Sequence, residues 1–207
     1  MQNTLKRLID LVGASIGIIV LSPLFLLIAA WIWIDSGRPI LFLQDRLGKN
    51  GKVFKMYKFR SMIRDADKME EGLISYKGDR RITTPGRFIR IASLDELPQL
   101  FNILAGSMSI VGPRPAVINE LGNYADLDDR TKIRFTVKPG LTGLAQISGR
   151  NALTWPQKID HDLEYLERFR KYGVLEDIRI ILITVFVVFS ARNTVEGPPP
   201  PNPSDSA

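Results

Sequence analysis

Two adjacent carboxylates, Asp95 and Glu96, are the residues of this chain whose type and setting best suit chemistry. Arg87 and Arg90 precede them within reach, and Ser93 stands three positions before Glu96, the spacing of a capping box that predicts a helix start. Acidic residues in a first turn offset the unpaired N–H groups of the helix. The same position can also hold a phosphate for attack by a carboxylate nucleophile. On these residues alone, both interpretations remain open.

The start of this helix is uncertain by two residues because of Pro98. If Ser93 is the cap, a proline five residues later loses a backbone hydrogen bond. If Asp95 is the cap, Pro98 falls at the third helical position, where a missing N–H costs nothing. The sequence predicts a helix that continues through Leu104 in either case.

The composition limits the kinds of partner and chemistry. A chain of 207 residues can build one domain with a real core. The net charge of +6, with 28 Lys plus Arg against 22 Asp plus Glu, favours anionic partners such as a membrane surface, phosphates or nucleic acid. The absence of cysteine excludes disulfides, thiolate chemistry and cysteine-ligated zinc. The single histidine, His161, lies in a polar segment typical of a solvated helix rather than of a general base.

Residues 11–34 contain no charge, and a run of this length predicts a membrane helix. Ser22 and Pro23 lie in its middle, where proline kinks or breaks a helix. Basic residues flank both ends, so the positive-inside tendency draws both ends to the cytoplasm. We therefore expect a re-entrant hairpin kinked at Ser22-Pro23, with a straight span or a buried core helix as the alternatives.

The segment after the apolar run predicts a small β-hairpin. Residues 40–43 form a short apolar run, 48–51 are typical of a turn, and 52–62 mix aromatic residues with cations. Such a strand suits anionic headgroups or phosphates. No helix-turn-helix, zinc finger or RNA-recognition motif accompanies it, so we expect no nucleic-acid partner.

Later segments predict further helices and contain two arginines, Arg114 and Arg150, that could bind an anion such as phosphate. An ordinary structural loop is the alternative for the Arg114 segment, and on these residues alone it is the simpler interpretation. Arg114 lies between two prolines, which presents its guanidinium with little entropy to lose. Arg150 follows a glycine-rich segment that has neither the Walker nor the dinucleotide spacing. Helices are predicted at the start of residues 64–78 and over 119–135, 158–171 and 178–189, the last too short to span a bilayer.

Together these patterns predict an α+β fold that is mainly α, with a compact helical domain, a small β-hairpin and interfacial amphipathic helices. We expect three parts: a membrane hairpin over residues 1–37, a compact domain with the acidic pair over 38–195 and a disordered Pro-rich tail over 196–207.

Five short motifs in this order resemble one family, the bacterial sugar transferases, and within it the small monotopic phosphoglycosyl transferases. The motifs are KFRSM (58–62), SLDELPQLFN (93–102), VGPRP (111–115), KPGLTG (138–143) and GRN (149–151). Each is weak alone, but their order after a Ser-Pro-broken apolar segment is specific, and the resemblance covers about residues 3–192.

The resemblance implies transfer of a sugar 1-phosphate from a UDP-sugar to polyprenyl (undecaprenyl) phosphate, giving polyprenyl-diphospho-sugar and UMP, as the first membrane step of glycan assembly. It implies Asp95 as the nucleophile that forms a covalent phosphosugar intermediate, Glu96 as its assistant, and Mg²⁺ as cofactor with Asp95 as its ligand. It also implies the bacterial inner membrane as location, with the catalytic domain on the cytoplasmic face.

The candidate residues for substrate and phosphate binding are arginines and one asparagine: Arg60, Arg87, Arg90, Arg114, Arg150 and Asn151. Unlike larger family members, this sequence has no multi-span region before the hairpin, so the resemblance predicts a minimal catalytic unit. The alternative is a non-catalytic adaptor that docks on anionic lipid through Lys52, Lys55 and Lys58. The sugar, the pathway and the oligomeric state do not follow from the sequence.

Overall fold

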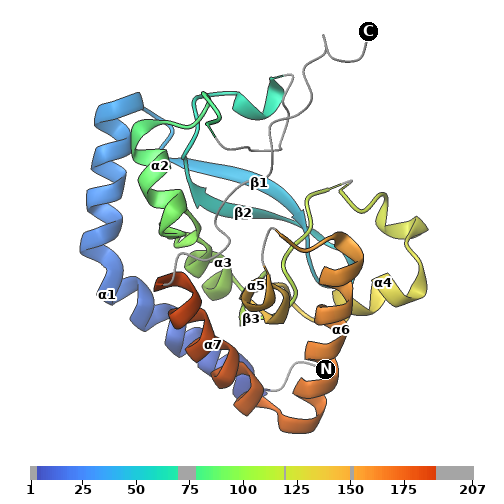
Figure 1. The fold of residues 1–207 in the computed structure, drawn as a ribbon. Coiled ribbons are helices and arrows are strands. Elements are labelled where there is room, and N and C mark those ends of the chain that lie inside the picture. Colours follow the sequence, from blue (N-terminus) through green and yellow to red (C-terminus); the bar gives the residue numbers. More distant parts are fainter. Residues whose placement is uncertain (1–3, 70–77, 119, 150–151, 190–207) are drawn as a thin grey trace, which may run out of the picture.

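The structure is a computed structural model that describes residues 4–69, 78–118, 120–149 and 152–189. Two candidate residues, Arg150 and Asn151, lie outside the described residues, as does the Pro-rich tail. Most of the described secondary structure is helical, as the sequence predicts (Figure 1). In chain order they are α1 (Thr4–Ser36), β1 (Leu41–Leu47), β2 (Val53–Phe59), α2 (Thr84–Ile91), α3 (Gln99–Ala105), β3 (Ser109–Val111), α4 (Asp129–Ile133), β4 (Gly140–Thr142), α5 (Leu144–Ser148), α6 (Trp155–Tyr172) and α7 (Val174–Phe189).

The long apolar segment forms one continuous helix, α1, whose ribbon changes direction partway along its length (Figure 1). It is long and apolar enough to cross a membrane by length and composition. Pro23 lacks the N–H that would bond the carbonyl of Ile19, and the hydroxyl of Ser22 donates to that carbonyl at 2.8 Å. The Ser-Pro pair is therefore accommodated without ending the helix. A re-entrant path through a bilayer stays a prediction.

One side of α1 packs on the rest of the protein and the other side does not. Ala14, Ile28 and Ile32 are buried, whereas Ile19 and Ile34 are 72% and 80% exposed. The buried residues join two clusters, one with Leu100 and Ile103 of α3, the other with Phe59 of β2 and Ile89 of α2. Because these contacts fix α2 and α3 on α1, they also fix the acidic segment between those two helices.

The predicted β-hairpin is confirmed. β1 and β2 pair antiparallel from Leu41 opposite Phe59 to Leu47 opposite Val53. The turn between them contains a short 3₁₀ helix, η1 (Lys49–Gly51), in which Asn50 and Gly51 adopt φ of 55° and 72°. Asparagine and glycine tolerate this left-handed backbone, which explains the turn.

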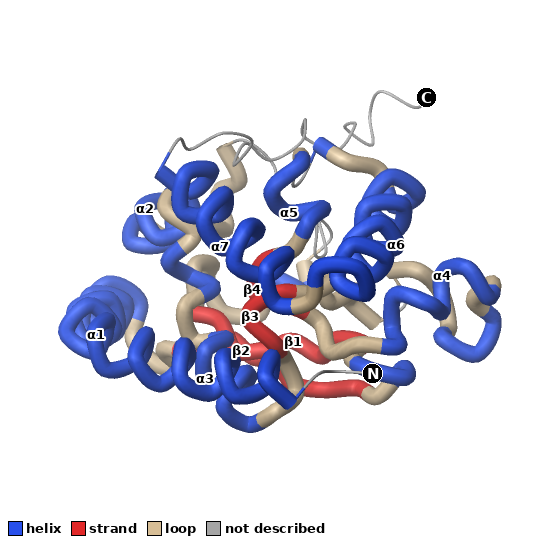
Figure 2. The backbone as a smooth tube through the Cα atoms, turned by 90° about the horizontal axis from the view of Figure 1, so that it is seen from below, coloured by secondary structure: helices blue, strands red, loops and turns tan. Residues whose placement is uncertain are grey.

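A second, two-stranded sheet was not predicted. β3 and β4 pair in parallel, and Figure 2 shows the strands of both sheets in the centre of the molecule with helices around them. The backbones approach so closely here that a Cβ atom on Gly140 would lie 2.1 Å from the nitrogen of Gly112. The glycines of this region therefore serve close backbone packing beside Arg114.

The prediction of a capping box at Ser93 and Glu96 is wrong. Ser93 has φ of 56° and forms no capping hydrogen bond, a 3₁₀ helix η3 (Leu94–Glu96) follows it, and α3 begins only after Pro98. Proline has no N–H to contribute to a preceding turn, so the α-helix starts where its backbone can bond. The Glu96 carboxylate instead accepts hydrogen bonds from side chains of other elements.

The polar helix predicted over residues 119–135 is also wrong. The described part contains only short elements: η4 (Tyr124–Asp126), α4 and η5 (Arg134–Thr136). Gly122 adopts φ of 86°, and Asp128 caps α4 by accepting from the N–H of Thr131 at 2.8 Å. A left-handed glycine and an internal cap divide the segment.

A helix was also predicted at the start of residues 64–78. Residues 64–69, the described part of that start, contain only a 3₁₀ turn, η2 (Ala66–Lys68).

The two predicted C-terminal helices are confirmed and slightly longer than expected, as α6 and α7. α6 begins with a capping box at Thr154 and Gln157. α7 buries Asp177 and Ile180 and exposes Leu182 and Phe186 on its other side. The apolar exposed side fits the prediction of an interfacial helix, which remains a proposal.

Candidate active site

The acidic pair lies on η3, between α2 and α3. Leu94 and Leu97 pack into the cluster of Ile28, Ile32 and Phe59, so the short turn is held from one side by apolar contacts. Asp95 lines a large cavity on the other side. This alternation of apolar and acidic residues in one tight turn presents the carboxylates to the cavity and its wall.

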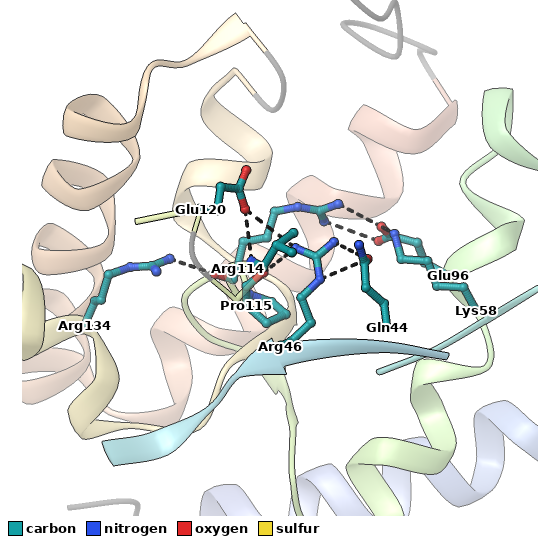
Figure 3. Close-up of polar contacts among 9 residues, drawn as sticks. Gln44, Arg46, Lys58, Glu96, Arg114, Pro115, Glu120 and Arg134 are labelled. Carbon is teal, nitrogen blue, oxygen red and sulfur yellow. Dashed lines mark hydrogen bonds and ion pairs between the residues drawn. The ribbon is translucent and has the colours of Figure 1, made fainter. Parts of the chain in front are cut away.

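Glu96 is fixed by two cations from distant parts of the chain. Lys58 Nζ of β2 lies 3.0 Å from Oε1, and Arg114 Nη2 donates to the same atom at 2.9 Å, with Nη1 3.4 Å from Oε2 (Figure 3). Burial alone would raise the pKa of Glu96, but the Arg114 and Lys58 charges hold it well below its usual range. Glu96 is therefore a permanent carboxylate that anchors two cavity cations.

Asp95 differs from Glu96 in its partners and in the direction in which its pKa is shifted. Within the described part of the chain its carboxylate forms no hydrogen bond or ion pair. Burial raises the pKa of Asp95 to about 6, opposed by Lys58 and reinforced by Glu96. Adjacent carboxyl groups with divergent pKa values are typical of sites where one group reacts and the other holds the surroundings. Asp95 is the carboxylate available for a ligand.

Arg114 is positioned by two buried guanidiniums that bond the backbone around it. Arg46 Nη1 donates to the carbonyl of Pro115 at 2.9 Å, and Arg134 Nη2 donates to the carbonyl of Arg114 at 2.7 Å (Figure 3). Arg134 is itself held by the carboxylate of Asp162 at 2.8 Å. We call Arg46 and Arg134 the backbone clamp. Together with the flanking prolines, the clamp fixes where the Arg114 side chain leaves the chain.

The cavity has a volume of about 1160 Å³ and is strongly basic. Its described lining has nine basic and three acidic side chains, so it suits a polyanionic ligand. The basic residues are Arg38, Arg46, Lys58, Arg60, Arg64, Lys68, Arg90, Arg114 and Lys158.

The predicted phosphate-binding residues divide into three groups. Arg60, Arg90 and Arg114 line the cavity together with Asp95. Arg87 is exposed on α2 and is not among the described lining residues. Arg150 and Asn151 lie outside the described residues, and Ser22 and Pro23 lie in the exposed middle of α1.

Arg60 connects the cavity to the end of α1. Its Nη2 donates to the Ser36 carbonyl, the Ser36 hydroxyl and the Gly37 carbonyl at 2.9, 2.7 and 2.8 Å. Its Nε and Nη1 are buried and have no hydrogen-bond partner within the described part of the chain. Arg60 also lines the cavity, so its guanidinium keeps donors for an anion that binds there.

Several lining residues were not predicted as site residues. Phe42, Gln44 and Arg46 of β1 line the cavity from the same face of the strand. Side chains two residues apart lie on one face of a strand, so placing any one of the three in the site would have predicted the other two. Lys58 stands in the first motif, and Lys158 of α6 carries no local signal at all. His161 is half-exposed on α6, 3.5 Å from Glu164, and is not among the described lining residues.

The acidic residues fit a magnesium ion only in part. No group of three or more acidic or histidine side chains that could hold a metal occurs in the described residues. Mg²⁺ usually takes one or two carboxylates and completes its shell with water and substrate phosphates. Asp95, whose carboxylate has no partner among the described residues, is the one such carboxylate that this basic cavity would supply beside Asp65 and the ion-paired Glu120.

A sequence model of the bacterial sugar transferases matches residues 1–191. The chain belongs to the bacterial sugar transferase family. The predicted resemblance is thereby confirmed, and the folded unit described above is a bacterial sugar transferase domain.

The relatives of this chain include proteins named as sugar or sugar-phosphate transferases. A galactosyl transferase, CpsE, of Streptococcus agalactiae serotype III (strain NEM316) is 40% identical over 194 residues, covering 88% of this chain and 42% of the relative. A UDP-glucose:undecaprenyl-phosphate glucose-1-phosphate transferase of Klebsiella pneumoniae is 41% identical, covering 89% and 40%. The exopolysaccharide production protein ExoY of Rhizobium meliloti (strain 1021) is 36% identical, covering 91% and 87%. The chain spans about two fifths of the length of the first two relatives and most of the third.

Proposed function

We propose that this protein transfers a sugar 1-phosphate from a UDP-sugar to polyprenyl phosphate, forming polyprenyl-diphospho-sugar and UMP. The observation that carries the proposal is the Asp95 carboxylate, which has no partner among the described residues and lines a basic cavity beside an ion-paired Glu96. The names of the relatives that use UDP-glucose or undecaprenyl phosphate agree with it.

The reaction would proceed in two displacements. An oxygen of Asp95 attacks the β-phosphorus of the UDP-sugar, the bond between that phosphorus and the α-phosphate oxygen breaks, and UMP leaves. A phosphate oxygen of the polyprenyl acceptor then attacks the same phosphorus, and the Asp95 carboxylate leaves. Splitting the transfer lets a soluble donor and a membrane-bound acceptor use one nucleophile in turn. A carboxylate needs no general base above its pKa, which fits a site without a nearby histidine.

The surrounding cations would stabilise the charge that accumulates in both steps. Arg114, Lys58, Arg90 and Arg60 line the cavity with Asp95, and two nitrogens of Arg60 have no partner among the described residues. Glu96 keeps Arg114 and Lys58 in place. Mg²⁺, when bound, would neutralise part of the diphosphate charge, with Asp95 as the ligand that this chain supplies.

Membrane attachment through α1 would bring this site to the acceptor. We propose that α1 enters and leaves the cytoplasmic leaflet at the bend near Ser22-Pro23, and that residues 38–195 form the catalytic domain on the cytoplasmic face of the bacterial inner membrane. The basic residues on both sides of the apolar segment and its exposed apolar side support this path.

A half-reaction without acceptor tests the function. The purified full chain is mixed with each of a panel of UDP-sugars that includes UDP-glucose and UDP-galactose, with Mg²⁺. We expect UMP release and a mass increase of one sugar phosphate on the peptide with Asp95 for at least one donor. Asp95→Asn removes both, whereas Asp45→Asn, on an exposed acid of β1 outside the described lining, keeps both.

Two results would contradict the proposal. One is the absence of UMP and of the adduct with every donor, including when polyprenyl phosphate is supplied. The other is an active Asp95→Asn protein. Salt-sensitive binding to anionic vesicles that does not depend on Asp95, without any turnover, would instead favour the membrane adaptor.

A further inference from the structure

The two ends of the cavity differ, because different elements line them. At one end Arg60 is bonded to Ser36 and Gly37, at the C-terminal end of α1. β1 begins beside this end and runs toward the start of α6 (Figure 1). Phe42, Gln44 and Arg46 line the cavity along the strand, a distance of about 13 Å at the usual rise per residue.

The acidic pair lies between the two ends. Lys58, which bonds Glu96, pairs with Phe42 in the hairpin register. Arg46 follows four residues later on β1, beside Arg114 and the carboxylate of Glu120 (Figure 3). The far end of the cavity is then closed by Trp155 and Lys158 of α6.

Lys158 is a half-buried cation that forms no ion pair with an acidic residue of the described chain. Its Nζ lies 4.8 Å from the centre of the Trp155 ring and forms no hydrogen bond or ion pair within the described chain. Burial lowers the pKa of Lys158, and the charges of Arg114 and Arg134 lower it further, against the pull of Glu120. A partly desolvated cation of this kind gains from pairing with an anionic ligand.

The other cations at this end are already engaged. Arg46 donates to Gln44 and Pro115, and Arg114 donates to Glu96. Arg134 bonds Asp162, and its guanidinium lies 5.3 Å from the Trp155 ring centre. Among the described basic residues at the α6 end of the cavity, Lys158 is therefore the one left for a ligand.

We propose that Lys158 binds the uridine diphosphate part of the donor, at the α6 end of the cavity. The inference rests on the proposed function. The polyprenyl chain of the acceptor stays in the bilayer with α1. The chain therefore extends from the acceptor phosphate toward the α1 end of the cavity. In-line displacement makes the acceptor oxygen attack from the side that UMP vacates, so the two substrates place their phosphates in the same space near Asp95 in turn. The Lys158 ammonium, at the α6 end of the cavity, is the cation that can pair with the uridine diphosphate there.

The matched pair of variants is Lys158→Gln and Lys171→Gln. Lys171 is on the same helix and also lies over an aromatic ring, 5.0 Å from the centre of Tyr172, but it is exposed and outside the described lining. The probe is UMP, whose dissociation constant is measured by calorimetry with the full chain in detergent. KM values for the donor and for polyprenyl phosphate are measured alongside.

We expect Lys158→Gln to weaken UMP binding and raise the donor KM by about tenfold or more, the size expected for one lost charge-assisted contact. The acceptor KM changes little, Lys158→Arg recovers most of the binding, and Lys171→Gln matches the unaltered protein. Unchanged UMP affinity in Lys158→Gln, an effect on the acceptor KM alone, or no UMP binding by the unaltered protein overturns the inference. Failure of the proposed function is separate: it shows as no UMP release from any UDP-sugar, whatever UMP alone does.

Discussion

The Nη2 atom of Arg114 lies 2.9 Å from Oε1 of Glu96, across a separation of 18 residues in the sequence. This ion pair, with the second one from Lys58, leaves Glu96 occupied and its neighbour Asp95 without a partner in the described chain. The two adjacent carboxylates therefore differ in what they contact. Glu96 holds the two cations, and Asp95 lines the cavity. The first two predictions below follow from that difference.

The rate of the first half-reaction should fall on the acid side of about pH 6. Burial raises the pKa of Asp95 to about 6, and only the deprotonated form can attack phosphorus. The rate is therefore full above this pH and drops about tenfold for each unit below it. UMP release without acceptor measures this cleanly, since the UDP-sugar carries no phosphate monoester that titrates there. An acid limb near the ordinary pKa of an aspartate would contradict the prediction.

Glu96→Gln should move this acid limb to lower pH and slow the reaction at neutral pH. The Glu96 charge raises the pKa of Asp95, so its removal makes Asp95 easier to ionise. Arg114 and Lys58 also lose the partner that holds them, and we expect a loss of about 10-fold to 100-fold in rate. The measurement is the pH profile of UMP release. Glu167→Gln, on an exposed acid of α6, serves as control and should change neither quantity.

Arg46→Lys should lower kcat by about 10-fold to 100-fold with a smaller change in the donor KM. Lysine cannot reproduce the fork that bonds Gln44 and Pro115 together, so one side of the backbone clamp is lost. Steady-state kinetics and circular dichroism separate this effect from unfolding. Arg130→Lys, which keeps an exposed surface pair with Asp160, should be neutral. Unchanged kcat in a folded Arg46→Lys protein would show that the clamp does not position Arg114.

Lys6→Met should destabilise the fold by about 3 kcal/mol or more. Lys6 of α1 and Asp177 of α7 form a buried ion pair at 2.5 Å, and removing one partner leaves the other charge uncompensated. Thermal unfolding in detergent measures the loss. The double variant Lys6→Met/Asp177→Leu removes both charges and should recover part of the stability, whereas equal loss in single and double variants would point to packing alone.

Pro23→Leu should straighten α1 and change its membrane path. Leucine supplies the N–H that Ile19 now lacks, and the hydroxyl of Ser22 is no longer needed at that carbonyl. The sequence has no cysteine, so a single cysteine at position 2 reports the side on which the N-terminus lies. We expect cytoplasmic labelling of the otherwise unaltered protein and mixed or reversed labelling after Pro23→Leu. Periplasmic labelling of both proteins would establish a straight span and contradict the re-entrant path.

The sequence by itself determined the features that depend on neighbouring residues. The apolar run predicted α1, the turn residues and alternation predicted the β-hairpin, and the apolar periodicity predicted α6. These signals are local, because a helix or a tight hairpin is set by side chains within a few positions. The motif order identified the family, and Asp95 was singled out as a carboxylate with arginines nearby.

Only the tertiary structure decided how the acidic pair is used. Ser93 and Glu96 have the spacing of a cap, yet Glu96 bonds Lys58 and Arg114, which lie 38 and 18 residues away. Charged contacts of this strength outweigh a capping bond worth about 1 kcal/mol. Lys55 and Lys58 looked like one basic strand, but an odd spacing puts them on opposite faces, and only Lys58 is at the cavity. Which charges meet depends on chain packing, and no local pattern records it.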